Sequence, residues 1–318
     1  DYNKLEHDTT PPYRVLFNHN HLNLKKQSHT PEAQHRCPSF YKKTKGGFSY
    51  PKINRKGDHM SKVIAISNQK GGVGKTATAL NLGTALSVQG KKVLLVDNDP
   101  QADLTACLGW RQPDTLQTTL YHLMQQSIAD QPIQTREAIL HSDEGVDLIP
   151  SSIELSDMEM SLVNAMSREY VLASCLHSVR KDYEYVIIDC PPTLGMITIN
   201  ALAASNSVIV PVQAQYLSAK GMTMLMQTIS KVRRSINPNL QIDGILLSLT
   251  DSRTNLTRST VNQVRELYQD TLHVFDTEIP SPVKVGESSI TGESILSYDR
   301  KNPVADAYEN LAKEVTER

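Results

Sequence analysis

The stretch NQKGGVGKTATALNLG, from Asn68 to Gly83, almost fits the phosphate-binding loop pattern G-x-x-x-x-G-K-[ST]. The first position of that pattern is Gln69 instead of glycine, and an additional lysine, Lys70, stands inside the loop. An apolar run, KVIAIS, precedes the loop and a helical pattern follows it, so the order strand, loop, helix is complete. The stretch therefore predicts a nucleotide phosphate site that carries one lysine more than the pattern requires.

The residue types of this loop suit phosphate chemistry. Gly71, Gly72 and Gly74 lack Cβ atoms, so backbone N–H groups can close around phosphate oxygens. The helix that follows adds its N-terminal partial positive charge. Lys75 brings a full charge to the β- and γ-phosphates, and Thr76 offers a hydroxyl to Mg²⁺. We expect the nucleotide-binding residues to be Lys70, Gly71, Gly72, Val73, Gly74, Lys75, Thr76 and Ala77.

Outward from the loop, strand and helix patterns alternate along the chain. The expected strands are Lys62–Ser67, Lys92–Asp97, Val146–Ile149, Tyr183–Pro192, Ser207–Gln213, Gln241–Thr250 and Val274–Glu278. The expected helices are Thr76–Gln89, most of residues 115–180, Ala219–Ile236, Asn255–Tyr268 and a final helix from Pro303. Continuous apolar strands that alternate with helices indicate a parallel sheet covered on both faces. Residues 60–318 are therefore predicted to form a single α/β P-loop NTPase domain with a mostly parallel sheet.

Two further motifs place acidic residues at strand ends. Asp97 and Asp99 flank a turn after the strand KVLLVD, and Asp189 ends the strand YEYVIID. In parallel sheets, ligands bind beyond the carboxyl ends of the strands, where the phosphate loop also lies. A carboxylate at this edge can hold a magnesium-bound water or orient an attacking water, so the three motifs support one another.

Composition places the chain among ordinary globular proteins. Hydrophobic residues make up 39% of its 318 residues and charged residues 21%. The sequence has no apolar run long enough for a transmembrane helix and no recognisable signal peptide. Its four cysteines show no C-x-x-C spacing, so we expect no zinc site and no disulfide framework, and a reducing cytosol as the compartment.

The first 59 residues differ from the rest. They carry eleven lysines and arginines against five acidic residues, and they show no sustained periodicity. The first methionine is Met60, which directly precedes the first expected strand. We expect residues 1–59 to be disordered and to be translated upstream sequence, with the native protein beginning at Met60. A basic disordered tail is the alternative interpretation.

Four separated motifs resemble those of one family. KGGVGKT, VLLVDNDPQAD, YVIIDCPPTLGMITINAL and VIVPVQAQYLSAKGM are similar, in order, to the ParA/Soj partition ATPases of the MinD/ParA group. The resemblance runs over essentially all of residues 60–316. It implies an ATPase that requires ATP and Mg²⁺, forms a homodimer on ATP binding and binds DNA non-specifically. It also implies a ParB-like partner, a role in plasmid, chromosome or mobile-element partitioning, and a cytoplasmic, nucleoid-associated location without membrane binding.

The resemblance also assigns roles to individual residues. In the family, the extra lysine, here Lys70, crosses the dimer interface to the partner's nucleotide phosphates. Thr76 then ligates Mg²⁺, and Asp97 and Asp189 act through the water shell of the metal. Asp99 helps to position the hydrolytic water. Lys70, Lys75 and Asp99 are the residues that the resemblance implies to be catalytic.

DNA contacts are expected from basic side chains in the C-terminal half. Arg253 is the first candidate, because relatives carry an arginine in the same R-T-N-L context. Ser281 departs from the family, which often has an arginine after I-P, and Lys284 is expected to substitute for it in part. Further basic candidates are Lys231, Arg233, Arg234, Arg258 and Arg265.

Other interpretations of the same motifs stay open. A MinD-like membrane-cycling ATPase needs a basic amphipathic C-terminal helix, whereas PVADAYENLAKEVTER has a more acidic polar face and is expected to dock on the core through Val304, Tyr308, Leu311 and Val315. An iron–sulfur relative needs clustered cysteines, a dethiobiotin-synthetase-like ligase needs a second substrate pocket, and a tyrosine autokinase needs a tyrosine cluster. A regulatory ATP-gated binding module with little hydrolysis is a further alternative.

Overall fold

The computed structural model describes residues 42–44, 47–49, 61–213, 219–250, 255–268, 271–281 and 292–318. The chain divides into two compact units, Asp1–Ile53 and Asn54–Arg318. In the first unit, strands β1 (Lys42–Thr44) and β2 (Gly47–Ser49) pair antiparallel. The other residues of the segment 1–59 lie outside the described part, so its predicted disorder and its origin stay predictions.

A sheet forms the centre of the second unit. Its strands in the described residues are β3 (Lys62–Ile66), β4 (Val93–Asp97), β5 (Leu140–His141), β6 (Asp147–Ile149), β7 (Tyr185–Asp189), β8 (Ser207–Gln213), β9 (Gln241–Thr250) and β10 (Val274–Pro280). They lie in the order β10-β9-β8-β3-β7-β4-β6-β5, and every neighbouring pair is parallel except β5 and β6. The predicted single α/β domain with a mostly parallel sheet is confirmed.

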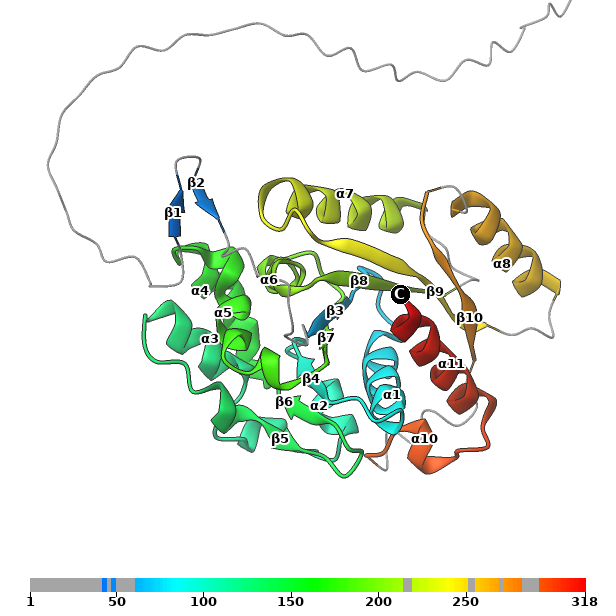
Figure 1. Cartoon of the computed structure of the whole chain (residues 1–318), viewed down its shortest axis with the longest axis horizontal. Helices are drawn as coiled ribbons and strands as arrows, with labels where there is room; N and C mark the ends of the chain where they lie inside the picture. Colours follow the sequence, from blue (N-terminus) through cyan, green and yellow to red (C-terminus); the bar gives the residue numbers. More distant parts are fainter. Residues whose placement is uncertain are drawn as a thin grey trace, which may run out of the picture. The chain divides into compact units, whose positions relative to one another are not determined.

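Helices cover both faces of this sheet (Figure 1). Those described are α1 (Lys75–Val88), α2 (Asp103–Cys107), α3 (Leu120–Ile128), α4 (Met158–Val163), α5 (Val171–His177), α6 (Met196–Ala204), α7 (Ala219–Ser235), α8 (Asn255–Tyr268), α10 (Ile295–Tyr298) and α11 (Pro303–Glu317). One apolar cluster joins the sheet to α3, α4, α5, α6 and α7, and a second joins it to α1, α2, α10 and α11.

Alternation along the central strands explains why both faces are buried. Val63 and Ala65 of β3 point into the first cluster, whereas Ile64 and Ile66 point into the second. Successive side chains of a strand point to opposite faces, so a continuous apolar run suits a strand that is covered on both sides. Burying each such valine or isoleucine contributes about 1.5–3 kcal/mol relative to leaving it exposed.

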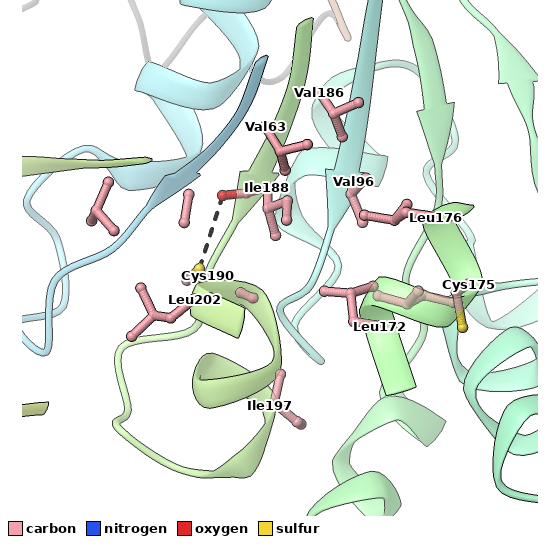
Figure 2. Packing of buried hydrophobic residues seen from close by; sticks show 14 of the residues in the cluster. Val63, Val96, Leu172, Cys175, Leu176, Val186, Ile188, Cys190, Ile197 and Leu202 are labelled. Carbon is pink, nitrogen blue, oxygen red and sulfur yellow. Dashed lines mark hydrogen bonds between the residues drawn. The ribbon is translucent and has the colours of Figure 1, made fainter. Parts of the chain in front are cut away.

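The first cluster packs closely between β4, β7 and the helices α5 and α6. Figure 2 shows Val96 of β4 near Leu176 of α5, and Val186 of β7 and Leu172 of α5 belong to the same cluster. Cys190 is fully buried there, and its thiol donates to the carbonyl oxygen of Ile188 at 3.9 Å. Cys190 is therefore a small buried residue of this cluster.

The region 115–180 differs from its prediction as mostly helical. The structure breaks it into three short α-helices, α3, α4 and α5, joined by 3₁₀ turns and by the strands β5 and β6. The prediction also missed α2, α6 and α10, which are short. Segments of four to nine residues hold too few turns for a helical period to stand out from the sequence, and tertiary packing decides their conformation.

Helix α11 docks on the core as expected. Val304, Tyr308, Leu311 and Val315 are all buried in the second cluster. Asn302 caps the helix by accepting a hydrogen bond from the backbone N–H of Val304 at 3.1 Å. The apolar face of α11 therefore lies against the protein and is not presented to a membrane surface.

Candidate nucleotide-binding site

The loop between β3 and α1 has the backbone geometry that its glycines allow. Gly72 and Gly74 adopt φ values of 71° and 84°, in the left-handed region that side chains disfavour. At Gly71, Gly72 and Gly74, no described atom beyond the glycine and its two chain neighbours lies within 4 Å of the position that a Cβ would take. Gly74 precedes α1 without offering a side-chain cap. This open space beside a helix N-terminus fits a phosphate group.

Asn68 fixes the position of the extra lysine. Its amide nitrogen donates to the carbonyl oxygen of Pro211 in β8 at 2.7 Å, and its Oδ1 accepts from the backbone N–H of Lys70 at 3.0 Å. Asn68 is buried, and its hydrogen bond to Pro211 is buried as well, whereas the one from Lys70 is only partly sheltered from water. The loop therefore begins with an asparagine-anchored turn that sets the backbone of Lys70, and no glycine is needed at Gln69.

Lys75 is the first residue of α1, and its side chain reaches back to the loop. Its ammonium donates to the carbonyl oxygen of Lys70 at 3.3 Å, and the hydroxyl of Ser248 in β9 holds the carbonyl of Val73 at 2.7 Å. Burial lowers the pKa of Lys75, and the nearby negative charge of Asp189 opposes that change. A buried ammonium with carboxylates nearby is prepared to neutralise an anionic ligand.

The carboxylates of Asp97 and Asp189 stand opposite each other at the ends of β4 and β7, where the two residues are register partners. Oδ2 of Asp97 accepts from the backbone N–H of Thr105 at 2.8 Å and from its hydroxyl at 2.6 Å. Burial raises the pKa of Asp97 to about 7 in spite of these hydrogen bonds. Burial, and then the charge of Asp97, raise the pKa of Asp189 well above its usual value.

Asp189 also contacts the loop. The hydroxyl of Thr76 hydrogen-bonds its carboxylate, which opposes the rise in its pKa. Its Oδ1 is buried and has no hydrogen-bond partner among the described residues. A buried carboxylate oxygen left without a partner suits a hard cation or its water shell. Within the described residues, no group of three or more histidine, cysteine or acidic side chains is placed to hold a metal alone. Phosphate and water oxygens would have to supply further ligands.

Asp99 completes the acidic edge. Its Oδ1 accepts from the backbone N–H of Gln101 at 3.0 Å, and the residue is half-buried. Burial raises the pKa of Asp99, and the charge of Lys75 lowers it, so the two groups interact across the site. The fold therefore gathers the phosphate-loop lysine and the three predicted aspartates at one edge of the sheet.

The predicted DNA contacts are less completely described. Arg253 and Lys284 lie outside the described residues. Ser281 follows β10, is exposed, and donates its backbone N–H to the carbonyl oxygen of Thr250 at 2.8 Å. Arg265 forms an ion pair with Glu278 at 3.2 Å, so its charge is partly engaged within the protein. Among the residues of α7 and α8 whose exposure is described, the exposed basic side chains are Lys231, Arg233, Arg234 and Arg258.

Two contacts of the acidic turn were not predicted. Thr105 of α2 binds Asp97 as described above, and the side-chain amide of Asn98 donates to the carbonyl oxygen of Ile197 in α6 at 3.3 Å. The sequence alone could have identified Asn98 as a residue of the site, since it stands between Asp97 and Asp99. Thr105 gave no signal, because it follows eight residues later in a helix too short to predict.

The described residues contain no helix that combines the length and the apolar character needed to cross a bilayer.

Comparison with known proteins finds a matching family and similar relatives. The family described as AAA domain matches residues 61–242. The chain is 42% identical over 256 residues to the sporulation initiation inhibitor protein Soj of Bacillus subtilis (strain 168), an alignment that covers 80% of this chain and 98% of that protein. It is 41% identical over 261 residues to the chromosome partitioning protein ParA of Caulobacter vibrioides (strain NA1000 / CB15N), covering 81% of this chain and 94% of that protein.

A solved structure is also similar. The crystal structure of cobyrinic acid a,c-diamide synthase from Mycobacterium smegmatis with bound ADP and magnesium is 37% identical in sequence. It superposes with a TM-score of 0.70, covering 81% of this chain and 94% of that one.

Proposed function

The chain belongs to the family of ParA and Soj partition ATPases, and on that premise we propose that it is an ATP-dependent dimerising switch that binds DNA non-specifically and partitions a plasmid, chromosome or mobile element. A ParB-like protein is the proposed partner that stimulates slow hydrolysis. The observation that carries the proposal is the convergence of Lys70, Lys75, Asp97, Asp99 and Asp189 at one edge of the sheet.

ATP and Mg²⁺ are the proposed ligands of this edge. The open glycine loop and the buried Lys75 fit the phosphates, and Thr76 with Asp97 and Asp189 fits the metal through its water shell. The similar structure from Mycobacterium smegmatis, which holds ADP and magnesium, supports the same assignment. When bound, the metal would supply positive charge at the phosphate oxygens.

The extra lysine is what makes a dimer the proposed active form. The side chain of Lys75 reaches back to the loop, and its ammonium contacts the backbone of Lys70. Lys75 already brings one positive charge to the phosphates of its own subunit, and Lys70 is the second lysine of the loop. Across a two-fold interface, its charge would neutralise the partner's nucleotide in a place from which water is excluded. Loss of the terminal phosphate would then weaken the dimer.

Size-exclusion chromatography with light scattering tests the switch. With ATP and Mg²⁺ the parent chain should elute as a dimer, and with ADP as a monomer. Lys75→Ala should lose nucleotide binding, whereas Lys70→Ala should bind nucleotide as a monomer and fail to dimerise. Lys92→Ala is the matched control, because Lys92 is an exposed lysine at the opposite end of β4. If Lys70→Ala dimerised with ATP as the parent does, the cross-interface role would be wrong.

DNA binding is proposed to use the basic side chains of α7. Each DNA phosphate that the protein neutralises makes the slope of log K against log salt more negative by about 0.9. A dimer that lacks three such charges per subunit should therefore have a slope that is shallower by up to about 5. The variant to measure combines Lys231→Ala, Arg233→Ala and Arg234→Ala. The charge-matched control combines Lys92→Ala, Lys181→Ala and Lys301→Ala. Equal slopes for the two variants would exclude α7 as the DNA surface.

The proposed partner and location need separate tests. A purified ParB-like protein encoded beside this gene should raise the ATPase rate in the presence of DNA, and a fluorescent fusion should follow the nucleoid. A regulatory module that binds ATP with little hydrolysis is the second candidate; it would show ATP-dependent DNA retention with no partner-stimulated turnover. The burial of the apolar face of α11 disfavours a MinD-like membrane cycle through that helix.

A further inference from the structure

Helix α6 begins without a side-chain cap of its own. Gly195 occupies its N-cap position, and so the first N–H groups of the helix need partners from elsewhere. Glu159 of α4 provides them. Its Oε2 accepts from the backbone N–H of Met196 at 2.9 Å, and its Oε1 accepts from that of Ile197 at 3.1 Å. A carboxylate in this place also interacts favourably with the helix dipole.

The glycine at the N-cap is required by this contact. Gly195 has φ −77° and ψ −171°, which any residue adopts, so backbone conformation does not demand a glycine there. A Cβ at Gly195 would instead stand far inside contact distance of both carboxylate oxygens of Glu159. The sequence therefore leaves space at Gly195 for a side chain from a different helix.

The same turn of α6 reaches the acidic edge of the nucleotide site. The carbonyl oxygen of Ile197 accepts from the side-chain amide of Asn98 at 3.3 Å. Asn98 lies between Asp97 and Asp99, and its backbone N–H donates to the carbonyl oxygen of Asp189 at 3.0 Å. Ile197 of α6 therefore contacts both groups. Its backbone N–H donates to the carboxylate of Glu159, and its carbonyl oxygen accepts from Asn98 of the acidic turn.

We propose that Glu159 is a positioning residue for ATP hydrolysis. By holding the first turn of α6, it fixes the loop 190–195 that follows Asp189, and through Asn98 it fixes the turn that carries Asp97 and Asp99. The inference rests on the proposed ATPase function, and it assigns Glu159 of α4 a role in positioning the acidic residues of the nucleotide site. Glu159 is half-buried, so water replaces part of its contact when it is removed. Removing Glu159 should therefore affect the positions of Asp97 and Asp99 more than the stability of the fold. Small displacements of reacting groups lower the reaction rate strongly.

The experiment compares Glu159→Ala and Glu159→Gln with a charge-matched control, Glu154→Gln. Glu154 is exposed in the turn before α4, and Oε2 of its carboxylate is 3.5 Å from the hydroxyl of Ser152. The measurements are kcat, the KM for ATP, the half-saturating Mg²⁺ concentration and the melting temperature. We expect Glu159→Ala to lower kcat by about 10–100-fold, the range typical of residues that orient metal-associated groups, with little change in KM. Glu159→Gln keeps one acceptor oxygen and should recover part of the rate.

Gly195→Ala disrupts the same contact by placing a methyl group where the carboxylate of Glu159 lies. It leaves Glu159 in the chain but displaces its carboxylate, and so it should reproduce the loss of kcat. It also serves if Glu159→Ala fails to fold. The proposal is overturned if Gly195→Ala, and Glu159→Ala where it folds, keep kcat and the Mg²⁺ half-saturation within about twofold of the parent, whatever happens to the melting temperature. That result would make Glu159 a structural cap only.

Failure of the proposed function would look different. If the parent chain hydrolysed no ATP with DNA and its partner present, the ATPase proposal would fail. The positioning role would then be measured as the Mg²⁺ dependence of ADP affinity. The role would be supported if the factor by which Mg²⁺ raises ADP affinity fell about tenfold in Glu159→Ala and Gly195→Ala, but not in Glu154→Gln. Equal enhancement in all variants would overturn it.

Discussion

Binding of magnesium-nucleotide should release protons from the acidic edge. Asp97 and Asp189 face each other at the ends of β4 and β7, both fully buried, and the pKa of Asp97 is raised to about 7. A group with this pKa is about nine-tenths protonated at pH 6 and about one-tenth protonated at pH 8. Carboxylates that serve a metal must be charged, so binding should expel close to one proton from Asp97 at pH 6 and very little at pH 8.

The size of the effect follows from the same shift. Raising the pKa from 3.8 to about 7 corresponds to roughly 4 kcal/mol for charging Asp97 in the folded protein without its ligand. Below pH 7 the affinity for magnesium-nucleotide should therefore rise by up to about tenfold for each pH unit, and it should level off above pH 7. The two carboxylates interact, so the titration belongs to the pair.

Isothermal titration calorimetry measures this release. Titrations at pH 6 in buffers of low and high ionisation enthalpy give the number of protons from the change in apparent binding enthalpy. The terminal phosphate of the nucleotide titrates in the same range, and Asp97→Asn supplies the control that subtracts it. An equal proton release by the parent and by Asp97→Asn, or an affinity ratio between them that stays constant from pH 6 to pH 8, would refute the reasoning.

The same shift determines the pH dependence of stability without nucleotide. Because the pKa of Asp97 is higher in the folded state than the ordinary 3.8, the folded protein binds more protons between about pH 4 and pH 7. The contribution of Asp97 to stability is thus fully present at low pH and is lost as pH rises to about 7. Melting temperatures measured from pH 5 to pH 8 should show a decline in the parent that is smaller in Asp97→Asn.

Three further substitutions test the site and the core. Thr105→Val removes the hydroxyl that donates to Asp97 at 2.6 Å; we expect a loss of about 1–3 kcal/mol in unfolding free energy, measured by urea denaturation, and a parent-like value would show that this hydrogen bond contributes nothing. Gly83→Val should destabilise by about 1–3 kcal/mol in thermal unfolding, since a Cβ at Gly83 would stand 2.6 Å from Cδ2 of Leu95, and an unchanged melting temperature would mean that β4 yields freely. Asp99→Ala should leave ATP binding intact and prolong the dimer in chromatography, whereas normal turnover in that variant would remove Asp99 from the hydrolytic role.

The sequence by itself determined the phosphate loop and the architecture around it. Both depend on local patterns. The glycines and Lys75 follow a short apolar strand and precede a helix, and the runs that end in Asp97 and Asp189 are long enough to identify as buried strands. In a parallel sheet such strands bring their carboxyl ends to one edge, so the gathering of the acids also followed from the sequence.

Only the tertiary structure decided which neighbours act on those residues. Glu159 reaches the start of α6 across 37 positions of sequence, and Thr105 reaches Asp97 from a five-residue helix. Arg265, one of the basic candidates for DNA contact, pairs with Glu278 of β10, and the sequence did not indicate that ion pair. Such contacts depend on how the elements pack and not on the spacing of residue types along the chain. The space between packed elements and the backbone groups that need hydrogen-bond partners there decide which side chain fits.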